Sequence, residues 1–184
     1  NFDYATLSGA DLSGRRFVSG SFNHTNLAGA SIAWADFGGA SMVGVDLHGA
    51  NATGTTFGLW GLHTWCCNWS WGPYTPGANL TGANLTNTNL VGARLAGATF
   101  VNVNLSSANM TGSTSYVCAD MNYPFWTQCV GTSFQNADFT NAIMTSGDFR
   151  ASNMLGVTYW QTTCPDGTLS TDNFGTCAGR GGGL

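Results

Sequence analysis

Large apolar side chains recur at every fifth position along most of this 184-residue chain. They form three blocks, Phe2–Phe57, Leu80–Met110 and Phe134–Tyr159, each in its own phase. A small residue, most often alanine, stands two positions before most of them. A period of five fits neither the 3.6-residue helical turn nor the two-residue alternation of a strand. The chain is therefore expected to turn once per repeat, with the apolar and the small residue pointing inward and three residues facing solvent.

The segments Ala-Asp-Leu-Ser-Gly at 10–14 and Ala-Asn-Leu-Thr-Gly at 78–82 resemble the repeat of the pentapeptide-repeat family. Of 25 central positions, 24 carry Leu, Phe, Ile, Met or Tyr, and Ala52 is the exception. The resemblance implies an all-β fold, a right-handed quadrilateral β-helix with four repeats per coil. Its coils would stack at the β spacing of about 4.8 Å. Arg15 occupies a small inward position, so we expect the first coil to be distorted or open to solvent there.

The repeats define one domain over residues 1–184. We assign repeats to 1–57, 78–112 and 132–160, insertions to 58–77 and 113–131, and a C-terminal cap to 161–184. If Leu62 and Ser115 are degenerate repeat centres, they lie eight repeats, or two whole coils, apart on the same side of the column. The two insertions are then expected to leave one above the other, about 10 Å apart, and to pack into one lateral lobe.

Both insertions are rich in aromatic residues, which can serve as an interaction lobe because Trp and Tyr are typical hot-spot residues and stack on sugar rings. A small secondary core under two loops is the alternative explanation. The residues of this predicted lobe are Trp60, Trp65, Trp69, Trp71, Tyr74, Tyr123, Phe125 and Trp126.

Six cysteines without a Cys-x-x-Cys spacing favour disulfides and an oxidising compartment over a zinc site. They are Cys66, Cys67, Cys118, Cys129, Cys164 and Cys177. Pairing among the first four stays open, either within each insertion or between the two. His63 could instead complete a zinc site with the nearby cysteines. We expect no bound metal and no cofactor.

The tail from Cys164 to Cys177, beginning Cys-Pro-Asp-Gly-Thr, resembles the C-terminal element of secreted bacterial pentapeptide-repeat proteins. That resemblance implies a Cys164–Cys177 bridge that closes a cap over the last coil and protects its edge. Asp166, Asp172 and Asn173 could bind calcium there, although these residues are also ordinary in turns.

All nine acidic residues are Asp and all five basic residues are Arg, which gives a net charge of −4. The absence of Glu and Lys, together with 26 glycines, disfavours long helices. So few charges give no field suited to nucleic acid, and no run is long enough to span a membrane. We expect a secreted or cell-surface protein whose export signal has been removed.

Seven Asn-x-Ser/Thr sequons permit N-glycosylation, although a repeat of the form Ala-Asn-Leu-Thr-Gly produces this pattern by itself. They begin at Asn23, Asn51, Asn68, Asn79, Asn84, Asn104 and Asn109.

No catalytic motif is present, and the three histidines are far apart in sequence, so we expect no enzyme. The preferred hypothesis is a secreted structural protein that self-assembles into a surface layer or filament. One alternative is an extracellular module that binds carbohydrate or protein through the Trp-rich lobe. Another, implied by the resemblance, is a DNA mimic that binds a topoisomerase. Against it, Asp11, Asp36 and Asp46 are expected on three different sides of the coil.

Overall fold

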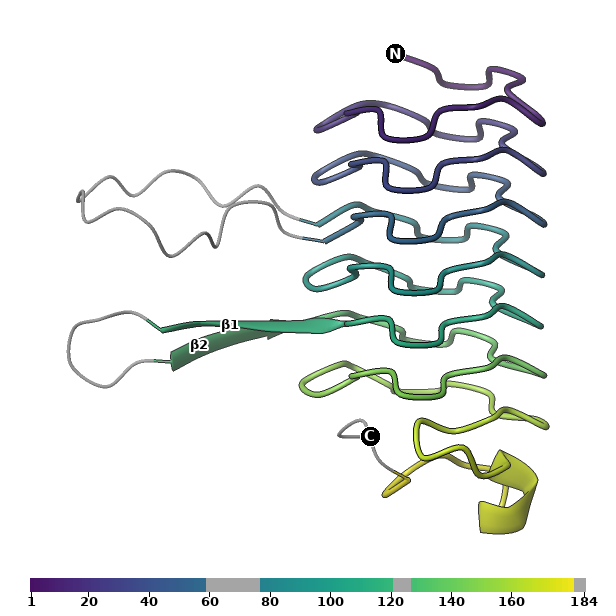
Figure 1. Ribbon diagram of the computed structural model, residues 1–184, viewed down its shortest axis with the longest axis vertical. Coiled ribbons are helices and arrows are strands. Elements are labelled where there is room, and N and C mark those ends of the chain that lie inside the picture. The colour runs from purple at the N-terminus through teal and green to yellow at the C-terminus, as the bar shows by residue number, and fades with distance from the viewer. Residues whose placement is uncertain (59–76, 121–126, 181–184) are drawn as a thin grey trace.

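The chain forms a column of stacked coils, with its two termini at opposite ends (Figure 1). The computed structural model describes residues 1–58, 77–120 and 127–180, and only the backbone of 116–120 and 127–130. Two strands, β1 (Tyr116–Asp120) and β2 (Thr127–Gly131), form an antiparallel hairpin that projects sideways from the column. A short 3-10 helix, η1 (Ser170–Asn173), lies at the C-terminal end.

Each coil has four sides because residues 20 apart pair in parallel, as Thr6 does with Asn26 and Asn26 with Asp46. We number the sides 1 to 4 by the central residues of the first coil, Phe2, Leu7, Leu12 and Phe17. Across the first insertion Asp46 pairs with Asn84, and across the second Asn104 pairs with Asp138. The column of coils therefore continues in register through both insertions.

Backbone hydrogen bonds join neighbouring coils and close most of the described corners. The Leu7 N–H donates to the carbonyl of Asn26 (2.7 Å), and the Asn26 N–H donates back to Ala5 (2.9 Å). The Ala10 N–H donates to the Leu7 carbonyl (3.1 Å) and closes the turn, in which Gly9 has a φ of 68°. Glycine suits this corner because a left-handed φ strains residues that carry a Cβ.

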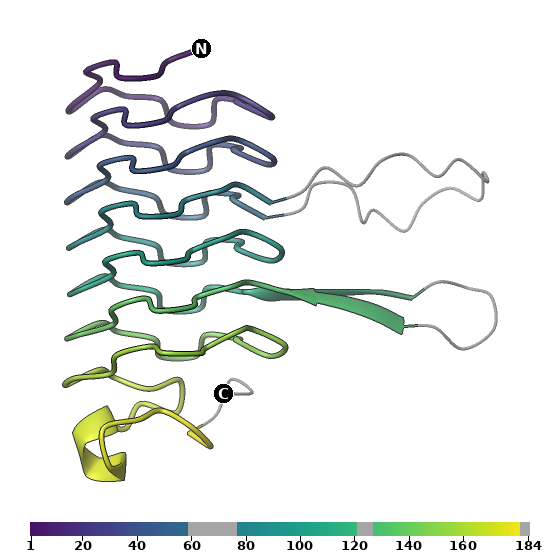
Figure 2. The same cartoon turned by 180° about the vertical axis from the view of Figure 1, so that it is seen from behind.

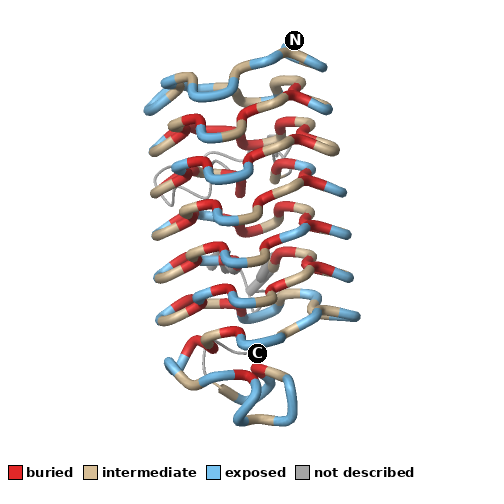
Figure 3. The backbone as a smooth tube through the Cα atoms, turned by 90° about the vertical axis from the view of Figure 1, so that its right-hand side faces the viewer, coloured by how far each residue is buried: buried red, intermediate tan, exposed pale blue. Residues whose placement is uncertain are grey.

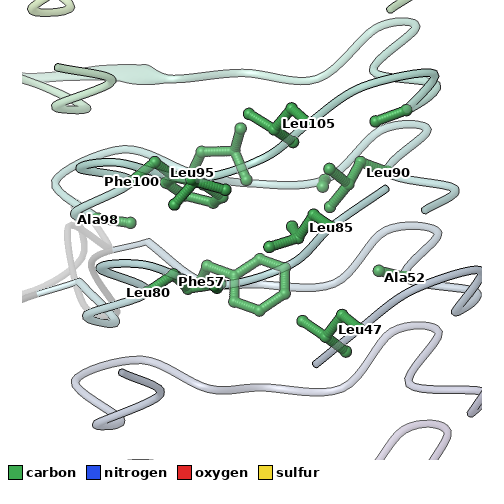
Figure 4. Packing of buried hydrophobic residues seen from close by; sticks show 14 of the residues in the cluster. Leu47, Ala52, Phe57, Leu80, Leu85, Leu90, Leu95, Ala98, Phe100 and Leu105 are labelled. Atoms are coloured by element: carbon green, nitrogen blue, oxygen red, sulfur yellow. The ribbon is translucent and has the colours of Figure 1, made fainter. Parts of the chain in front are cut away.

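The core is the shared interior of the coils. Leu80, Leu85, Leu90 and Leu95 come from the four sides of one coil and are fully buried. Figure 4 shows their side chains directed into the same interior space. Burial of each such side chain contributes about 1.5 to 3 kcal/mol before the cost of ordering the chain. Ala52, the weak centre in the sequence, is also fully buried.

Threonines that replace alanine at the small inward position bring a hydroxyl into this core, and each donates it to a backbone carbonyl of the preceding coil. Thr25, Thr55, Thr88, Thr132 and Thr162 make this contact at 2.7 Å with Phe2, Ile32, Leu47, Leu95 and Phe139, respectively. The buried hydroxyl of Ser113 has no hydrogen-bond partner among the described residues.

The first coil is open rather than distorted. Arg15 is exposed, but its carbonyl still accepts the usual hydrogen bond from the Asp36 N–H (2.9 Å). Figure 3 shows no buried residue in this coil, whereas the coils below it have buried residues on their sides. Arg15 is therefore accommodated without a change in the backbone of the coil, because its side chain is exposed.

The opposite end is closed by the predicted disulfide between Cys164 and Cys177, whose Cα atoms are 5.3 Å apart. Cys164 lies where the repeat places a central residue, and both cysteines are fully buried. Thr163 then pairs in antiparallel with Leu169, which begins the return of the chain over the last coil.

Candidate functional site

The two insertions leave the column from the same corner, between side 4 and side 1. Thr56 pairs with Arg94, and Arg94 pairs with Thr114, so the two points of departure lie in one column of residues, two coils apart. At the β spacing this separation is about 10 Å. The views in Figure 1 and Figure 2 show β1 and β2 leaving the column at this edge. The expected separation of two coils is thus found, but the count runs from Phe57 and not from Leu62, because Phe57 and Leu80 are the central residues of consecutive sides. The packing of the insertions into one lobe lies outside the described residues.

The first insertion enters a corner that keeps its ordinary closure. The Ala78 N–H donates to the Phe57 carbonyl at 2.6 Å, as the Ala40 N–H donates to Phe37 at 2.9 Å in the coil before. The insertion of residues 59–76 therefore interrupts a turn whose closing hydrogen bond is kept, and it leaves the register of the column unchanged.

Two glycines at this corner lie against the backbone of the next coil. A Cβ atom on Gly58 would stand 2.8 Å from the Ala96 carbonyl oxygen, and one on Gly77 would stand 2.4 Å from the Ala98 nitrogen. Real Cβ atoms do not approach backbone so closely, so both positions require glycine. The base of the first insertion is therefore fixed against the column.

The second insertion begins after Ser115, which keeps the central position of its repeat and is buried. The chain returns at Thr132, whose hydroxyl lies 2.7 Å from the Leu95 carbonyl and 3.0 Å from that of Ser115. Between them the hairpin pairs Tyr116 with Gly131. A Cβ on Gly131 would lie 2.0 Å from the Ala151 carbonyl oxygen, so this base also rests on the next coil.

The predicted lobe falls outside the described residues. Trp60, Trp65, Trp69, Trp71, Tyr74, His63, Cys66 and Cys67 belong to 59–76, and Tyr123, Phe125 and Trp126 belong to 121–126. Their role as an interaction surface stays a prediction. Cys118 and Cys129 lie on β1 and β2, and their backbones are paired.

Other exposed aromatic residues were missed in the sequence. Trp34 is 71% exposed at a corner with a φ of 61°, and its indole covers Gly54 of the next coil. Tyr4 stacks on His24 at 5.2 Å, and Phe174 is fully exposed beside η1. The signal for Trp34 was its place two residues after a repeat centre, where glycine is common.

The predicted sequons are part of the turn structure. In four of them the Asn Oδ1 accepts hydrogen bonds from both the N–H and the hydroxyl of the Thr two residues later, a side-chain turn that these residue types favour. These asparagines are Asn51, Asn79, Asn84 and Asn109. Asn104 accepts from the Ser106 N–H, and Asn23 accepts from Ser41 and Val43 of the next coil. Asn68 is not described, and glycosylation stays a prediction.

The aspartates are spread over the column and do not form a stripe. Asp36 and Asp148 lie on side 4, each next to an arginine: Asp36 Oδ2 is 3.4 Å from Arg16 Nε, and Asp148 Oδ2 is 2.6 Å from an Arg150 nitrogen. The hydrogen bond from Arg150 lowers the pKa of Asp148 against the opposing effect of burial. Asp11 lies on side 3, as expected.

Side 2 carries two acidic groups, Asp46 and Asp138, separated along the column by Asn84 and Asn104. Burial raises the pKa of Asp138, but hydrogen bonds from Thr140 and Ser106 outweigh burial and hold it below its ordinary value.

Residues proposed as calcium ligands have local partners. Asp166 Oδ1 accepts from the N–H and hydroxyl of Thr168, and the Asn173 amide donates to the carbonyls of Thr176 and Ala178. Among the residues that the structure describes, His, Cys and Asp side chains do not gather in threes as a metal site would require. The described part of the chain also has no helix with the length and apolar character of a membrane span.

The repeats place this protein in the pentapeptide repeat family. The family's sequence profile, described as pentapeptide repeats, matches in eight copies over residues 5–42, 21–58, 77–114 and 126–156. The chain therefore belongs to this family, whose fold is the right-handed quadrilateral β-helix. No curated protein matches the chain.

Solved structures with the same fold share low sequence identity with the chain. HetL, a pentapeptide repeat protein involved in heterocyst differentiation regulation in the cyanobacterium Nostoc sp. strain PCC 7120, is 21% identical over 90% of this chain, with a TM-score of 0.47. QnrB1, a plasmid-mediated fluoroquinolone resistance protein, is 21% identical over 81% of this chain, with a TM-score of 0.41. The chain spans 66% of HetL and 65% of QnrB1, just under two thirds of each.

The predicted self-assembling surface or filament subunit is wrong by these comparisons. HetL is involved in the regulation of differentiation and QnrB1 in drug resistance, and neither is described as a filament subunit. A further similar structure is a pentapeptide repeat protein of the Arabidopsis thaliana thylakoid lumen, with 24% identity over 80% of this chain and 66% of that one and a TM-score of 0.21.

Proposed function

We propose that this protein is a non-catalytic scaffold that binds a protein partner through the corner where both insertions leave the column. The observation that carries the proposal is the pairing of Thr56 and Thr114 with Arg94, which sets the two insertions two coils apart on one edge. A surface built from two separate chain segments suits an extended partner better than a small ligand, which usually needs a concave pocket.

The fixed bases support the same proposal. Gly58, Gly77 and Gly131 lie so close to the next coil that each insertion starts and ends at a defined place. A rigid support lowers the entropy cost of binding because less of the surface must be ordered when the partner arrives. The described histidines, His24 and His48, belong to different sides of the column, sides 1 and 2.

Deletion of residues 59–76 gives a clean test. The deletion joins Gly58 to Gly77 and produces the corner Phe-Gly-Gly-Ala, the same sequence that the chain already has at residues 37–40. Because the Ala78 to Phe57 hydrogen bond is already present, the column should fold unchanged. A second variant that lacks residues 117–130 joins Tyr116 to Gly131 and removes the hairpin in the same way.

The measurement is quantitative cross-linking and affinity capture from the source cells with the full chain and both deletion variants. We expect a partner that the full chain retains and that at least one deletion loses, with circular dichroism and the melting temperature preserved. Ser107→Lys, on the exposed corner between sides 2 and 3, is the matched control and should keep the partner. Loss with Ser107→Lys, or equal binding by both deletions, would contradict the proposal.

Carbohydrate is the competing ligand for the same edge. A glycan array with the full chain and the 59–76 deletion separates the two: binding of a glycan that the deletion abolishes would replace the protein partner with a sugar. The Trp-rich sequence of 59–76 is the reason to include this arm.

A topoisomerase-binding DNA mimic is the second candidate, favoured by family membership. The charge distribution is its weak point, since Asp36 and Asp148 have arginine neighbours and only Asp46 and Asp138 share side 2. A gyrase supercoiling assay with and without a fluoroquinolone tests it. Protection of the enzyme that survives both deletions would favour the mimic over the scaffold.

We also propose that the protein works in an oxidising compartment, as a secreted or cell-surface protein. The Cys164–Cys177 disulfide supports this, because such bonds persist outside the reducing cytosol. Thiol counting on protein isolated from its own cells would test it, and a reduced Cys164–Cys177 pair would contradict it.

A further inference from the structure

The hairpin of the second insertion brings two cysteines to one position of an antiparallel ladder. In β1 and β2 the partners are Tyr116 with Gly131, Cys118 with Cys129 and Asp120 with Thr127. Residues directly opposite each other in such a ladder lie on the same face of the ribbon. Their Cα atoms are about 4.5 or 5.5 Å apart, depending on whether the pair is hydrogen-bonded.

Both spacings fall within the Cα separation of about 4.4 to 6.8 Å that a disulfide requires. The register is held from the column, because Ser115 and Thr132 are both fixed in the core at the base of the hairpin. A slip of the ladder would need one of these residues to leave its buried place. The backbone therefore presents the two cysteines as a pair, which the sequence alone could not distinguish from pairing between the insertions.

We propose that Cys118 and Cys129 form a disulfide across the hairpin. The two thiols lose two protons and two electrons, which pass by thiol–disulfide exchange to an oxidised dithiol oxidoreductase that is itself reduced. The Cys118–Cys129 pair is the third of the five pairs in the ladder, two pairs before Asp120 and Thr127, so the bond would hold the strands together where the ribbon extends away from the column. The proposal needs the oxidising compartment and is independent of the partner.

Double digestion of the whole protein decides it. After denaturation and alkylation of free thiols, trypsin cuts after Arg94, Arg150 and Arg180, and an aspartate-specific protease cuts before Asp120 and Asp138 among other sites. Each alternative then has its own mass, because the cysteines fall in separate peptides: 46–94 (Cys66 and Cys67), 95–119 (Cys118), 120–137 (Cys129), 151–165 (Cys164) and 172–180 (Cys177).

We expect peptide 95–119 joined to 120–137, two hydrogens lighter than their sum and separated by reduction, with 46–94 joined to no other peptide. A link from 46–94 to either of the other two would overturn the proposal. The pair 151–165 and 172–180 serves as the internal control. If that control pair is linked while Cys118 and Cys129 are alkylated, the proposed hairpin disulfide is wrong but the proposed oxidising compartment is retained. If the control pair is also alkylated, the hairpin disulfide and the oxidising compartment are both wrong.

A second readout uses variants. If the bond exists, Cys118→Ser, Cys129→Ser and the double variant should have the same effect on cleavage of the hairpin by chymotrypsin, because each removes the same bond. Cys164→Ser should leave hairpin cleavage unchanged. Additive effects of Cys118→Ser and Cys129→Ser would overturn the proposal.

Discussion

The two ends of the column meet solvent in different ways. At the first coil Phe2 is 39% exposed, and Leu7 and Leu12 are only partly buried. At the last coil Met154 and Tyr159 are likewise only partly buried, but Cys164 is fully buried, although no further coil follows it among the described residues. The difference shows where burial comes from in a solenoid: each central residue is covered by the coils on both sides, and a missing neighbour must be replaced.

The cap replaces that neighbour with a short return of the chain. Ser170, the first residue of η1, is buried, and its hydroxyl donates to the Tyr159 carbonyl at 2.9 Å while accepting from the Thr162 N–H at 3.1 Å. The Cys164–Cys177 bond fixes the far end of this return. The cap also pairs with backbone groups of the last coil: the Ser170 N–H donates to the Thr162 carbonyl at 2.8 Å, and the Cys164 N–H donates to the Thr168 carbonyl at 2.7 Å.

Removal of a phenylalanine ring should give the largest difference in stability between the first coil and the interior of the column. Phe37 is fully buried and stacks between Phe17 (5.1 Å) and Phe57 (5.8 Å), so Phe37→Ala should lower the free energy of unfolding by about 3 to 5 kcal/mol. Phe2→Ala at the open end should cost about 1 to 2 kcal/mol, because part of the ring is already in water. Urea unfolding of both variants measures this, and equal losses would mean that the first coil is covered as fully as the interior of the column.

Removal of the Cys164–Cys177 disulfide should have the second-largest effect on stability. Cys164→Ser combined with Cys177→Ser opens a loop with a sequence separation of 13, which should cost about 2 to 4 kcal/mol. The loss should be local: hydrogen exchange should speed up in the last coil, at the Ser170 and Thr162 amides, and stay unchanged in the first. A uniform increase along the column would show that the cap stabilises the whole solenoid instead.

Removal of a buried threonine hydroxyl at each end of the column should change the stability less than removal of the disulfide. Thr162 donates to Phe139 beneath the cap, and Thr25 donates to Phe2 in the open coil, both at 2.7 Å. Thr162→Val should cost about 1 kcal/mol because one buried hydrogen bond is lost while the Phe139 carbonyl still accepts from the Ala142 N–H, and Thr25→Val about 0.5 kcal/mol because water can replace the hydroxyl. Thermal unfolding compares them. Ser113→Ala is the control and should not destabilise, since its hydroxyl has no partner among the described residues.

The sequence predicted the interior because a period of five admits one inward face. It also predicted the two-coil separation of the insertions, although it counted to Ser115 from Leu62, whereas the column counts from Phe57. It missed that Cys164 is itself a central residue, because a cysteine in a disulfide tail does not signal a repeat. It left the first coil undecided, since Arg15 fits an open end as well as a distorted one. The sharing of hydroxyls between coils at Thr25 could not be foreseen either, because it depends on a carbonyl that the fold brings close from 23 residues away.

Lowering the pH should have the smallest effect on stability. Substitution of one aspartate in the first coil and one in the interior of the column compares the two regions. Hydrogen bonds, first from Ser21, lower the pKa of Asp3 in the first coil, and those from Thr140 and Ser106 lower that of Asp138 against the effect of burial. A carboxyl with a lowered pKa in the folded state stabilises the protein above its unfolded pKa of about 3.9 and loses this contribution as the pH falls through the folded value. Asp138→Asn keeps an acceptor for Thr140 but removes the charge, so we expect a loss of under about 1 kcal/mol at pH 7 and none at pH 2. Asp3→Asn, at a half-buried carboxyl of the first coil, should change the melting temperature less at either pH, and an equal or larger change would mean that the first coil holds its charges as firmly as the interior.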